Sequence, residues 1–491
     1  MSGLDAKSAA PPAVAASRYL GDGCWLSGLA LAIRALVVLW ARARFPPADD
    51  GSFYHSVAQR IAHGAGYTWL WPDGAVTYAA HYPVGYPALI GAAYAVFGAR
   101  PVVAMALNAA LGSLAVFAAQ RAIIRRNTRA CALVAGLLVA LHPGLVFYTP
   151  ALMTEGVAAE LLVIAVWLAL RVDDRRRPAW RMVALGACLG VTTLVRPQLI
   201  VMAPFFGFFA LGSRNADYSQ RALRAFLVTF LAVCCCLPWT IRNCKRMDHC
   251  VFVSANGGWN LLIGTAREAK GAWRPIDGPS VPVECRDVFG EADKDRCFGR
   301  AGFRKVVADP AGFVALIPRK LAVTFDYFGA PSHYLNTSNS REFDDSRKMR
   351  LGVLETVWER LVLLAAIAQA AWRSLGRRPL RWGIGAAAGI FSLSRAGWLG
   401  YLGFVIATVL SGRKLQQQPI ATLGASLILV TALTHAAFFG AGRYGFVCAA
   451  LLCLAAVGER ELPAGDAESV ADSAIRDRLA RTSRDSFDSQ G

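Results

Sequence analysis

The sequence contains little charge, and acidic residues are especially scarce. Only 17% of the 491 residues are Asp, Glu, Lys or Arg, and 33 acidic residues stand against 52 basic ones. A soluble globular protein usually carries about 25% charge. The mean hydropathy of +0.39 shows that apolar residues take the place of the missing charge. This composition excludes the two or three soluble domains that a chain of this length normally forms.

The chain also lacks the basic surface that nucleic acids require. Its formal net charge is +19, but the arginines form neither a patch nor a stripe interleaved with aromatic residues. They lie in short breaks between apolar runs, as in the cytoplasmic loops of membrane proteins. These breaks contain Arg121, Arg125, Arg126 and Arg129, then Arg171, Arg175, Arg176, Arg177 and Arg181. We therefore expect no nucleic-acid partner.

Two further features are missing from the sequence. The first apolar run, from Cys24 to Trp40, is followed by Arg42 and Arg44 without a small-residue cleavage site, so it reads as an uncleaved first helix. No clear internal repeat is visible, whereas many secondary transporters are built from repeats.

Apolar runs that match the length of a bilayer crossing, about 20 residues, fill most of the chain. They predict an all-α polytopic membrane protein with about 11–13 transmembrane helices, and outer loops that carry short juxtamembrane helices. The segment 382–411 has Arg395 in its middle and is predicted to form a tight hairpin. The other spans are expected near 24–41, 101–120, 131–149, 154–170, 182–196, 198–212, 223–240, 354–372, 420–439 and 445–458.

The basic breaks orient these spans, because positive loops stay in the cytoplasm. Loops 121–130, 171–181 and 213–224 are therefore placed inside, and alternation places Asp50 and Gly257 outside. The expected parts are a cytoplasmic N terminus 1–23, a transmembrane core 24–240 with the first outer loop 42–100, a large outer loop 241–353, C-terminal transmembrane helices 354–458 and a disordered cytoplasmic tail 459–491.

Four cysteines lie in the large outer segment, and none of the spacings is typical of a zinc site. Four cysteines allow three pairings. We expect Cys285 to pair with Cys297 and Cys244 with Cys250, because each pair closes a short loop in an oxidising space.

The first outer loop begins with two acids, Asp49 and Asp50, followed by a short amphipathic pattern that ends near Gly64. This pattern predicts a helix at the membrane surface, capped by Asp50 or Ser52. The two acids would then lie at the outer interface. A partly desolvated acid there, with a raised pKa, could act as a general base.

Several short motifs occur in a fixed order along the chain. They are Asp50 before the short helix, Gly64-Ala65-Gly66-Tyr67, Pro83-Val84-Gly85-Tyr86-Pro87, Thr149-Pro150-Ala151-Leu152-Met153-Thr154-Glu155, Val195-Arg196-Pro197, Pro238-Trp239-Thr240-Ile241-Arg242-Asn243, Asn256-Gly257-Gly258-Trp259-Asn260-Leu261 and Arg443-Tyr444. Over about residues 25–458, this series resembles the GT-C superfamily of membrane glycosyltransferases. The nearest branch is that of the bacterial protein mannosyltransferases and lipid A aminoarabinose transferases, which are family 39-like.

The resemblance implies transfer of a hexosyl or pentosyl group from a polyprenyl-phosphate donor to a lipid, glycan or protein acceptor. The expected location is the outer face of a bacterial inner membrane, among membrane lipids. Asp50 would be the base, with Asp49 and Glu155 as further candidates. The donor phosphate would be held by Arg443, Arg242, Lys245, His81 and Tyr444, with Arg196 at the same interface.

Some alternatives stay open from the sequence. No cofactor is certain, although Asp50 and Glu155 could hold a divalent cation. The chain departs from the family where His81 replaces a basic arginine and where the proline after Arg443-Tyr444 is missing. A polytopic transporter or lipid flippase is the rival class, although the intramembrane acids are expected to be few and placed at the rim. A non-catalytic lipid-binding relative is the third reading.

Overall fold

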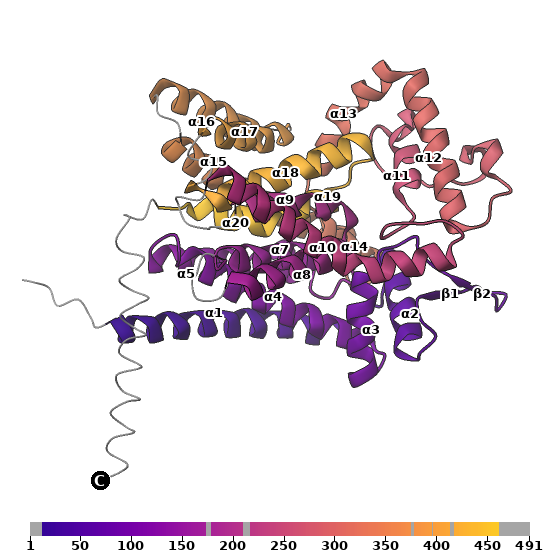
Figure 1. Ribbon diagram of the computed structural model, residues 1–491, viewed down its shortest axis with the longest axis horizontal. Helices are drawn as coiled ribbons and strands as arrows, with labels where there is room; N and C mark the ends of the chain where they lie inside the picture. Colours follow the sequence, from indigo (N-terminus) through magenta and orange to yellow (C-terminus); the bar gives the residue numbers. More distant parts are fainter. Residues whose placement is uncertain are drawn as a thin grey trace, which may run out of the picture.

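The computed structural model describes residues 12–172, 178–209, 217–374, 378–394, 396–412 and 417–460. Within these ranges the fold is almost entirely helical, as the apolar runs predicted. The one sheet is a hairpin of β1 (Thr68–Leu70) and β2 (Val76–Tyr78), paired antiparallel with Trp69 opposite Thr77. Most of the long helices run side by side along the longest axis of the molecule (Figure 1).

The bundle contains four helices long and apolar enough to cross a membrane, within the described ranges. They are Gly23–Ala41 of α1 (Pro12–Ala41), α4 (Pro101–Ile123), α10 (Tyr218–Arg246) and α18 (Pro419–Ala437). Other helices pack among them. They are the long, more polar α15 (Asp345–Ser374) and the shorter α5 (Arg129–Ala140), α7 (Thr154–Ala169), α8 (Pro178–Val195), η1 (Pro197–Val201) with α9 (Met202–Phe209), α16 (Arg378–Leu393), α17 (Trp398–Val409) and the run of α19 (Gly442–Gly445), η6 (Phe446–Cys448) and α20 (Ala449–Val457).

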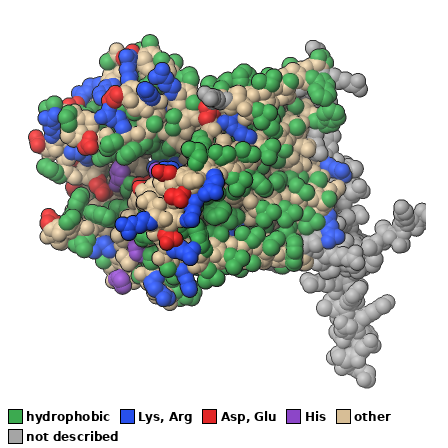
Figure 2. Space-filling view, turned by 180° about the vertical axis from the view of Figure 1, so that it is seen from behind, with side chains coloured by type: hydrophobic (Ala, Val, Ile, Leu, Met, Phe, Trp, Pro, Cys, Tyr) green, Lys and Arg blue, Asp and Glu red, His purple; other side chains and the backbone are tan. Residues whose placement is uncertain are grey.

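The outer surface of the bundle is apolar, as lipid contact requires. On α10, the large side chains of Leu223, Phe226, Phe230 and Leu237 are exposed. Figure 2 shows hydrophobic side chains over most of one face, with side chains of both charges gathered at one end. The all-α polytopic membrane fold predicted from the sequence is therefore confirmed.

One detail of the expected topology is wrong. The span predicted at 131–149 is broken at His142, because Pro143 starts a separate short helix, α6 (Pro143–Phe147). The first outer loop also contains an apolar helix, α3 (Gly85–Phe97), which packs on α2, α4 and α8. In contrast, α16 and α17 form the predicted hairpin, although Arg395 lies outside the described residues.

The segments that the sequence predicts to lie outside gather at the charged end of the bundle. They comprise α2 (Asp50–Ala62), the β1–β2 hairpin, α11 (Gly257–Gly264), α12 (Glu291–Ala308), α13 (Pro310–Phe325) and α14 (Ala330–Ser338) (Figure 1). Both predicted disulfides are confirmed, with Cys244 bonded to Cys250 and Cys285 to Cys297. The second bridge lies in a small core with Phe298 and Leu262, which holds α11 against α12.

Acids are not confined to the rim of the bundle, so that expectation is wrong. Glu160 on α7 is buried 3.8 Å from the Arg34 guanidinium, and Glu359 Oε1 on α15 is hydrogen-bonded to His142 Nε2 at 3.0 Å. At the opposite end, Glu459 is buried and paired with Arg126. The predicted tail therefore begins as packed chain, and residues 461–491 lie outside the described ranges.

Candidate active site

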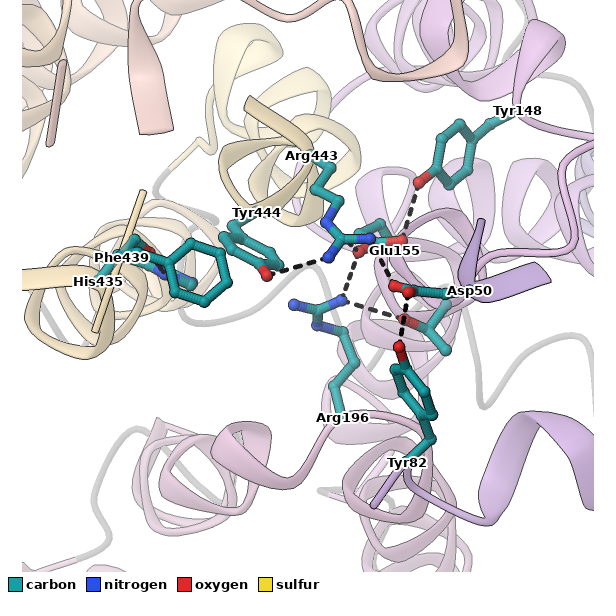
Figure 3. A network of polar contacts seen from close by, with 10 residues as sticks. Asp50, Tyr82, Tyr148, Glu155, Arg196, His435, Phe439, Arg443 and Tyr444 are labelled. Carbon is teal, nitrogen blue, oxygen red and sulfur yellow. Dashed lines mark hydrogen bonds and ion pairs between the residues drawn. The ribbon is translucent and has the colours of Figure 1, made fainter. Parts of the chain in front are cut away.

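A cavity of about 1270 Å³ lies among α2, α7, η1, α11, α13, α14 and α19. Its walls combine the ends of bundle helices with parts of the segment 241–353, which the sequence predicts to lie outside. Most of the site residues expected from the sequence line it, namely Asp49, Asp50, His81, Glu155, Arg196, Arg443 and Tyr444. Figure 3 shows that Asp50, Glu155, Arg196 and Arg443 point toward one another.

Asp50 lies in the first turn of α2, and its side chain turns into the cavity. Its Oδ1 accepts a hydrogen bond from the Tyr82 hydroxyl at 2.7 Å, and its Oδ2 accepts one from Arg443 Nη1 at 2.6 Å. The prediction that Asp50 or Ser52 caps α2 is wrong, because Asp49 occupies the N-cap position and its side chain accepts no capping hydrogen bond. Asp49 has φ of 48°, a conformation that is rare for a residue other than glycine.

The surroundings of Asp50 lower its pKa. Burial acts to raise the pKa, but the Arg443 charge and the hydrogen bonds from Tyr82 and Arg443 together outweigh it. The raised pKa expected from the sequence is therefore wrong. Burial and the neighbouring Asp50 raise the pKa of Tyr82, so its hydroxyl stays protonated and donates to the carboxylate.

Glu155 is buried in the first turn of α7 and forms the second acidic point of the network. Its Oε1 accepts a hydrogen bond from Arg196 Nη1 at 2.8 Å and lies 3.7 Å from Arg443 Nε. Its Oε2 accepts a hydrogen bond from the Tyr148 hydroxyl at 2.8 Å. Arg443 therefore bridges the two carboxylates, one on α2 and one on α7 (Figure 3).

Tyr444 supports both arginines of the network. The guanidinium carbons of Arg196 and Arg443 lie 5.2 and 5.0 Å from the centre of its ring. Arg443 Nη2 also donates to the Tyr444 hydroxyl at 3.2 Å. The imidazole of His435 stacks on the Tyr444 ring, with 4.2 Å between the ring centres, and is hydrogen-bonded to the Phe439 carbonyl. The aromatic ring thus holds two cations at the cavity wall.

The remaining sequence candidates have different surroundings. His81 lines the cavity beside Trp259, and burial lowers the pKa of its imidazole despite the opposing charge of Asp50, so the ring is neutral at pH 7. Arg242 donates to the Tyr67 and Ala79 carbonyls and does not line the cavity. Lys245 is exposed and also lies outside the cavity wall.

The donor set around Asp50 and Glu155 does not suit a divalent cation, because the Arg443 guanidinium already occupies the space between the two carboxylates. In the described part of the chain, no three acidic, histidine or cysteine side chains are grouped as metal ligands. Sequence reasoning missed Tyr148 as a partner of Glu155. Tyr148 directly precedes the Thr149-Pro150 motif, but its spacing from Glu155 carries no recognisable signal.

One known protein family is similar to part of the chain. The sequence profile of the family described as dolichyl-phosphate-mannose-protein mannosyltransferase matches residues 81–241. This segment contains His81, Tyr82, Glu155 and Arg196 of the site. The resemblance to membrane glycosyltransferases that the motifs indicated is confirmed over this segment. No curated protein matches the chain.

Among solved structures, the oligosaccharyltransferase of Archaeoglobus fulgidus with a tethered acceptor peptide is similar at 14% identity and a TM-score of 0.44, covering 89% of this chain and 49% of that one. The same organism's AglB with an inhibitory peptide and a dolichol-phosphate is similar at 14% identity and a TM-score of 0.42, covering 95% of this chain and 52% of that one. ArnT of Cupriavidus metallidurans bound to undecaprenyl phosphate is similar at 15% identity and a TM-score of 0.38, covering 89% of this chain and 77% of that one. The chain spans about half the length of the archaeal proteins.

Proposed function

We propose that the protein is an integral membrane glycosyltransferase that moves a sugar from a polyprenyl-phosphate donor to an acceptor on the outer face of the membrane. The observation that carries this proposal is the contact of 2.6 Å between Asp50 and Arg443 on the wall of a large cavity. A proton acceptor and a cation for a phosphate leaving group are thereby side by side.

The reaction follows from the chemistry of these two groups. The Asp50 carboxylate takes the proton of the acceptor hydroxyl or amine, and the acceptor atom forms a bond to the anomeric carbon of the sugar. The bond from that carbon to the phosphate oxygen breaks, and its electron pair leaves with the polyprenyl phosphate. Arg443 and Arg196 stabilise the negative charge that collects on the phosphate.

Donor binding also changes the strength of Asp50 as a base, because it changes the pKa of the carboxyl group. A phosphate in the cavity competes with Asp50 and Glu155 for the Arg443 guanidinium, which contacts both carboxylates. As Arg443 turns toward the phosphate, Asp50 loses its nearest opposite charge, and its pKa rises. Asp50 is therefore a stronger base in the loaded enzyme than in the free one.

The location of the cavity supports an outward-facing active site in a bacterial inner membrane. The cavity is covered by the segment that carries two disulfides, and these bonds persist in an oxidising compartment such as the periplasm. The C-terminal ends of α4 and α7, which the arginine-rich breaks follow in the sequence, lie at the other end of the bundle (Figure 1). Positive loops favour the cytoplasmic side.

Purified protein in lipid nanodiscs, supplied with radiolabelled polyprenyl-phosphate sugars and envelope acceptors, tests the proposal. We expect label to move from the donor to an acceptor and polyprenyl phosphate to be released. In proteoliposomes, movement of labelled lipid between leaflets without any transfer would instead identify a flippase. Saturable donor binding without transfer to any acceptor would identify a non-catalytic relative.

A further inference from the structure

The segment that carries Arg443 is unusually rich in glycine and lies directly on the backbone of α13. Gly440, Gly442 and Gly445 alternate with larger residues in the run Gly440-Ala441-Gly442-Arg443-Tyr444-Gly445. A Cβ atom on each would come well inside 3.0 Å of a backbone oxygen, of Lys320, Tyr327 and Thr324 respectively. The close approach of this run to α13, and to Tyr327 just beyond the end of that helix, therefore depends on the absence of side chains at these three positions.

Lys320 fixes the end of the preceding helix to the same surface. Its side chain is fully buried, and its Nζ donates to the carbonyls of Ala436 at 2.9 Å and Ala437 at 3.4 Å. These carbonyls belong to the last turn of α18, where no intrahelical donor remains. The positive charge also suits the C-terminal end of a helix dipole. Lys320 thus caps α18 from α13.

A third contact holds the short link between α18 and Arg443. The Gly440 amide donates to the Gly271 carbonyl at 2.8 Å, and Ala272 forms a parallel bridge with Gly440. The link from Phe438 to Gly442 is therefore held by α13 on one side and by the turn at Gly271 on the other. Its direction fixes where the next residue, Arg443, projects (Figure 3).

We propose that Lys320 is a positioning residue, through which the outer segment aims the Arg443 guanidinium at Asp50, Glu155 and the donor phosphate. Lys320 does not line the cavity, so it acts through the end of α18 and the glycine run rather than by touching substrate. This inference rests on the proposed function, because it takes Arg443 as the residue that binds the phosphate. It assigns a role in donor binding to α13, which lies outside the segment matched by the family profile.

The test compares two substitutions of Lys320 with a matched change on the same helix. Lys320→Met keeps most of the side-chain volume and removes the charge and both hydrogen bonds, whereas Lys320→Arg keeps a buried cation and donors. Leu316→Ala removes a buried side chain one turn earlier on α13. For each variant, binding of undecaprenyl phosphate, donor KM, kcat and thermal stability are measured in nanodiscs.

We expect Lys320→Met to weaken undecaprenyl phosphate binding roughly tenfold to a hundredfold, since a misplacement of about 1 Å can have an effect of this size. Lys320→Arg should restore most of the affinity, and Leu316→Ala should lower thermal stability while leaving donor affinity unchanged. Unchanged binding in Lys320→Met, or an equal loss of binding in Leu316→Ala, would overturn the positioning role.

A double-mutant cycle with Arg443→Ala separates this inference from the proposed function. If Lys320 acts through Arg443, Lys320→Met should add no further loss of donor binding once Arg443 is gone. Fully additive losses would refute the positioning role and leave the proposed function intact. If Arg443→Ala alone left donor binding unchanged, the assignment of Arg443 to the phosphate, and with it the proposed function as stated, would fail.

Discussion

Replacing Asp50 by Asn removes the proposed base while changing few contacts. The carboxylate accepts one hydrogen bond from Tyr82 and one from Arg443. The Asn oxygen can keep the bond from Arg443, and the Tyr82 hydroxyl can turn to accept from the new amide. The side chain also makes no helix cap in the native protein. Folding and thermal stability should therefore change little.

Transfer should change much more than stability. An amide cannot take a proton at neutral pH, and loss of a general base typically costs roughly 10²–10⁴-fold in rate. At about 1.36 kcal/mol for each factor of ten, this corresponds to about 3–5 kcal/mol of transition-state stabilisation. The assay is single-turnover transfer from a radiolabelled polyprenyl-phosphate sugar under saturating donor, with melting temperature measured on the same preparations.

Asp49→Asn serves as the matched control. Asp49 is exposed at the cavity mouth and neither caps α2 nor contacts Arg443, so its loss should affect transfer less. If Asp50→Asn transferred sugar at the full rate while Asp49→Asn did not, the base would be the neighbouring residue. If both variants kept full transfer, the first outer loop would hold no base, and the mechanism above would be refuted.

Five further outcomes are expected. The acid limb of the pH profile of kcat/KM, which reports the free enzyme, should lie at a pH below the usual pKa range of aspartate, because Arg443 and Tyr82 lower the pKa of Asp50. Activity is lost only as the pH falls through this lowered pKa, since the base must be deprotonated. The acid limb of kcat should lie at higher pH, and Tyr82→Phe should move the kcat/KM limb upward by removing one of these hydrogen bonds. Arg443→Lys should raise donor KM about tenfold in steady-state assays, a loss of about 1.4 kcal/mol, because one ammonium cannot contact both carboxylates. Replacing Cys285 and Cys297 by Ser should cost about 3 kcal/mol of unfolding free energy in denaturant titrations, and no loss would contradict a structural bridge.

Much of the fold could be predicted because its signals are local. Apolar runs located the bundle helices, the amphipathic pattern after Asp50 located α2, and cysteine spacing gave both disulfides. The break at His142 was missed because the apolar run continues through it, and hydropathy averages conceal a single His-Pro step. Helix α3 was missed because it is short and lies in a segment assigned to the outside as a whole.

The site was harder to predict because its decisive contacts join distant parts of the chain. Asp50 and Arg443 are 393 residues apart in sequence and 2.6 Å apart in space. The motifs suggested both residues, but only the contact shows that the pKa of Asp50 is lowered rather than raised. Arg242 illustrates the opposite case, since its motif matched while its guanidinium holds the Tyr67 and Ala79 carbonyls.

The charge balance of the network explains why a base and a phosphate-binding arginine should share one contact. Asp50 and Glu155 carry two negative charges, and Arg196 and Arg443 carry two positive ones, so the network is neutral before substrate enters. During transfer the leaving phosphate gains negative charge while Asp50 gains a proton and becomes neutral. Arg443, which donor binding has turned toward the phosphate, is then no longer drawn back by a charged Asp50 at the moment when the phosphate most needs a cation. The proton transfer and the charge development therefore support each other, and neither Asp50 nor Arg443 could be moved away from the other without loss of that coupling.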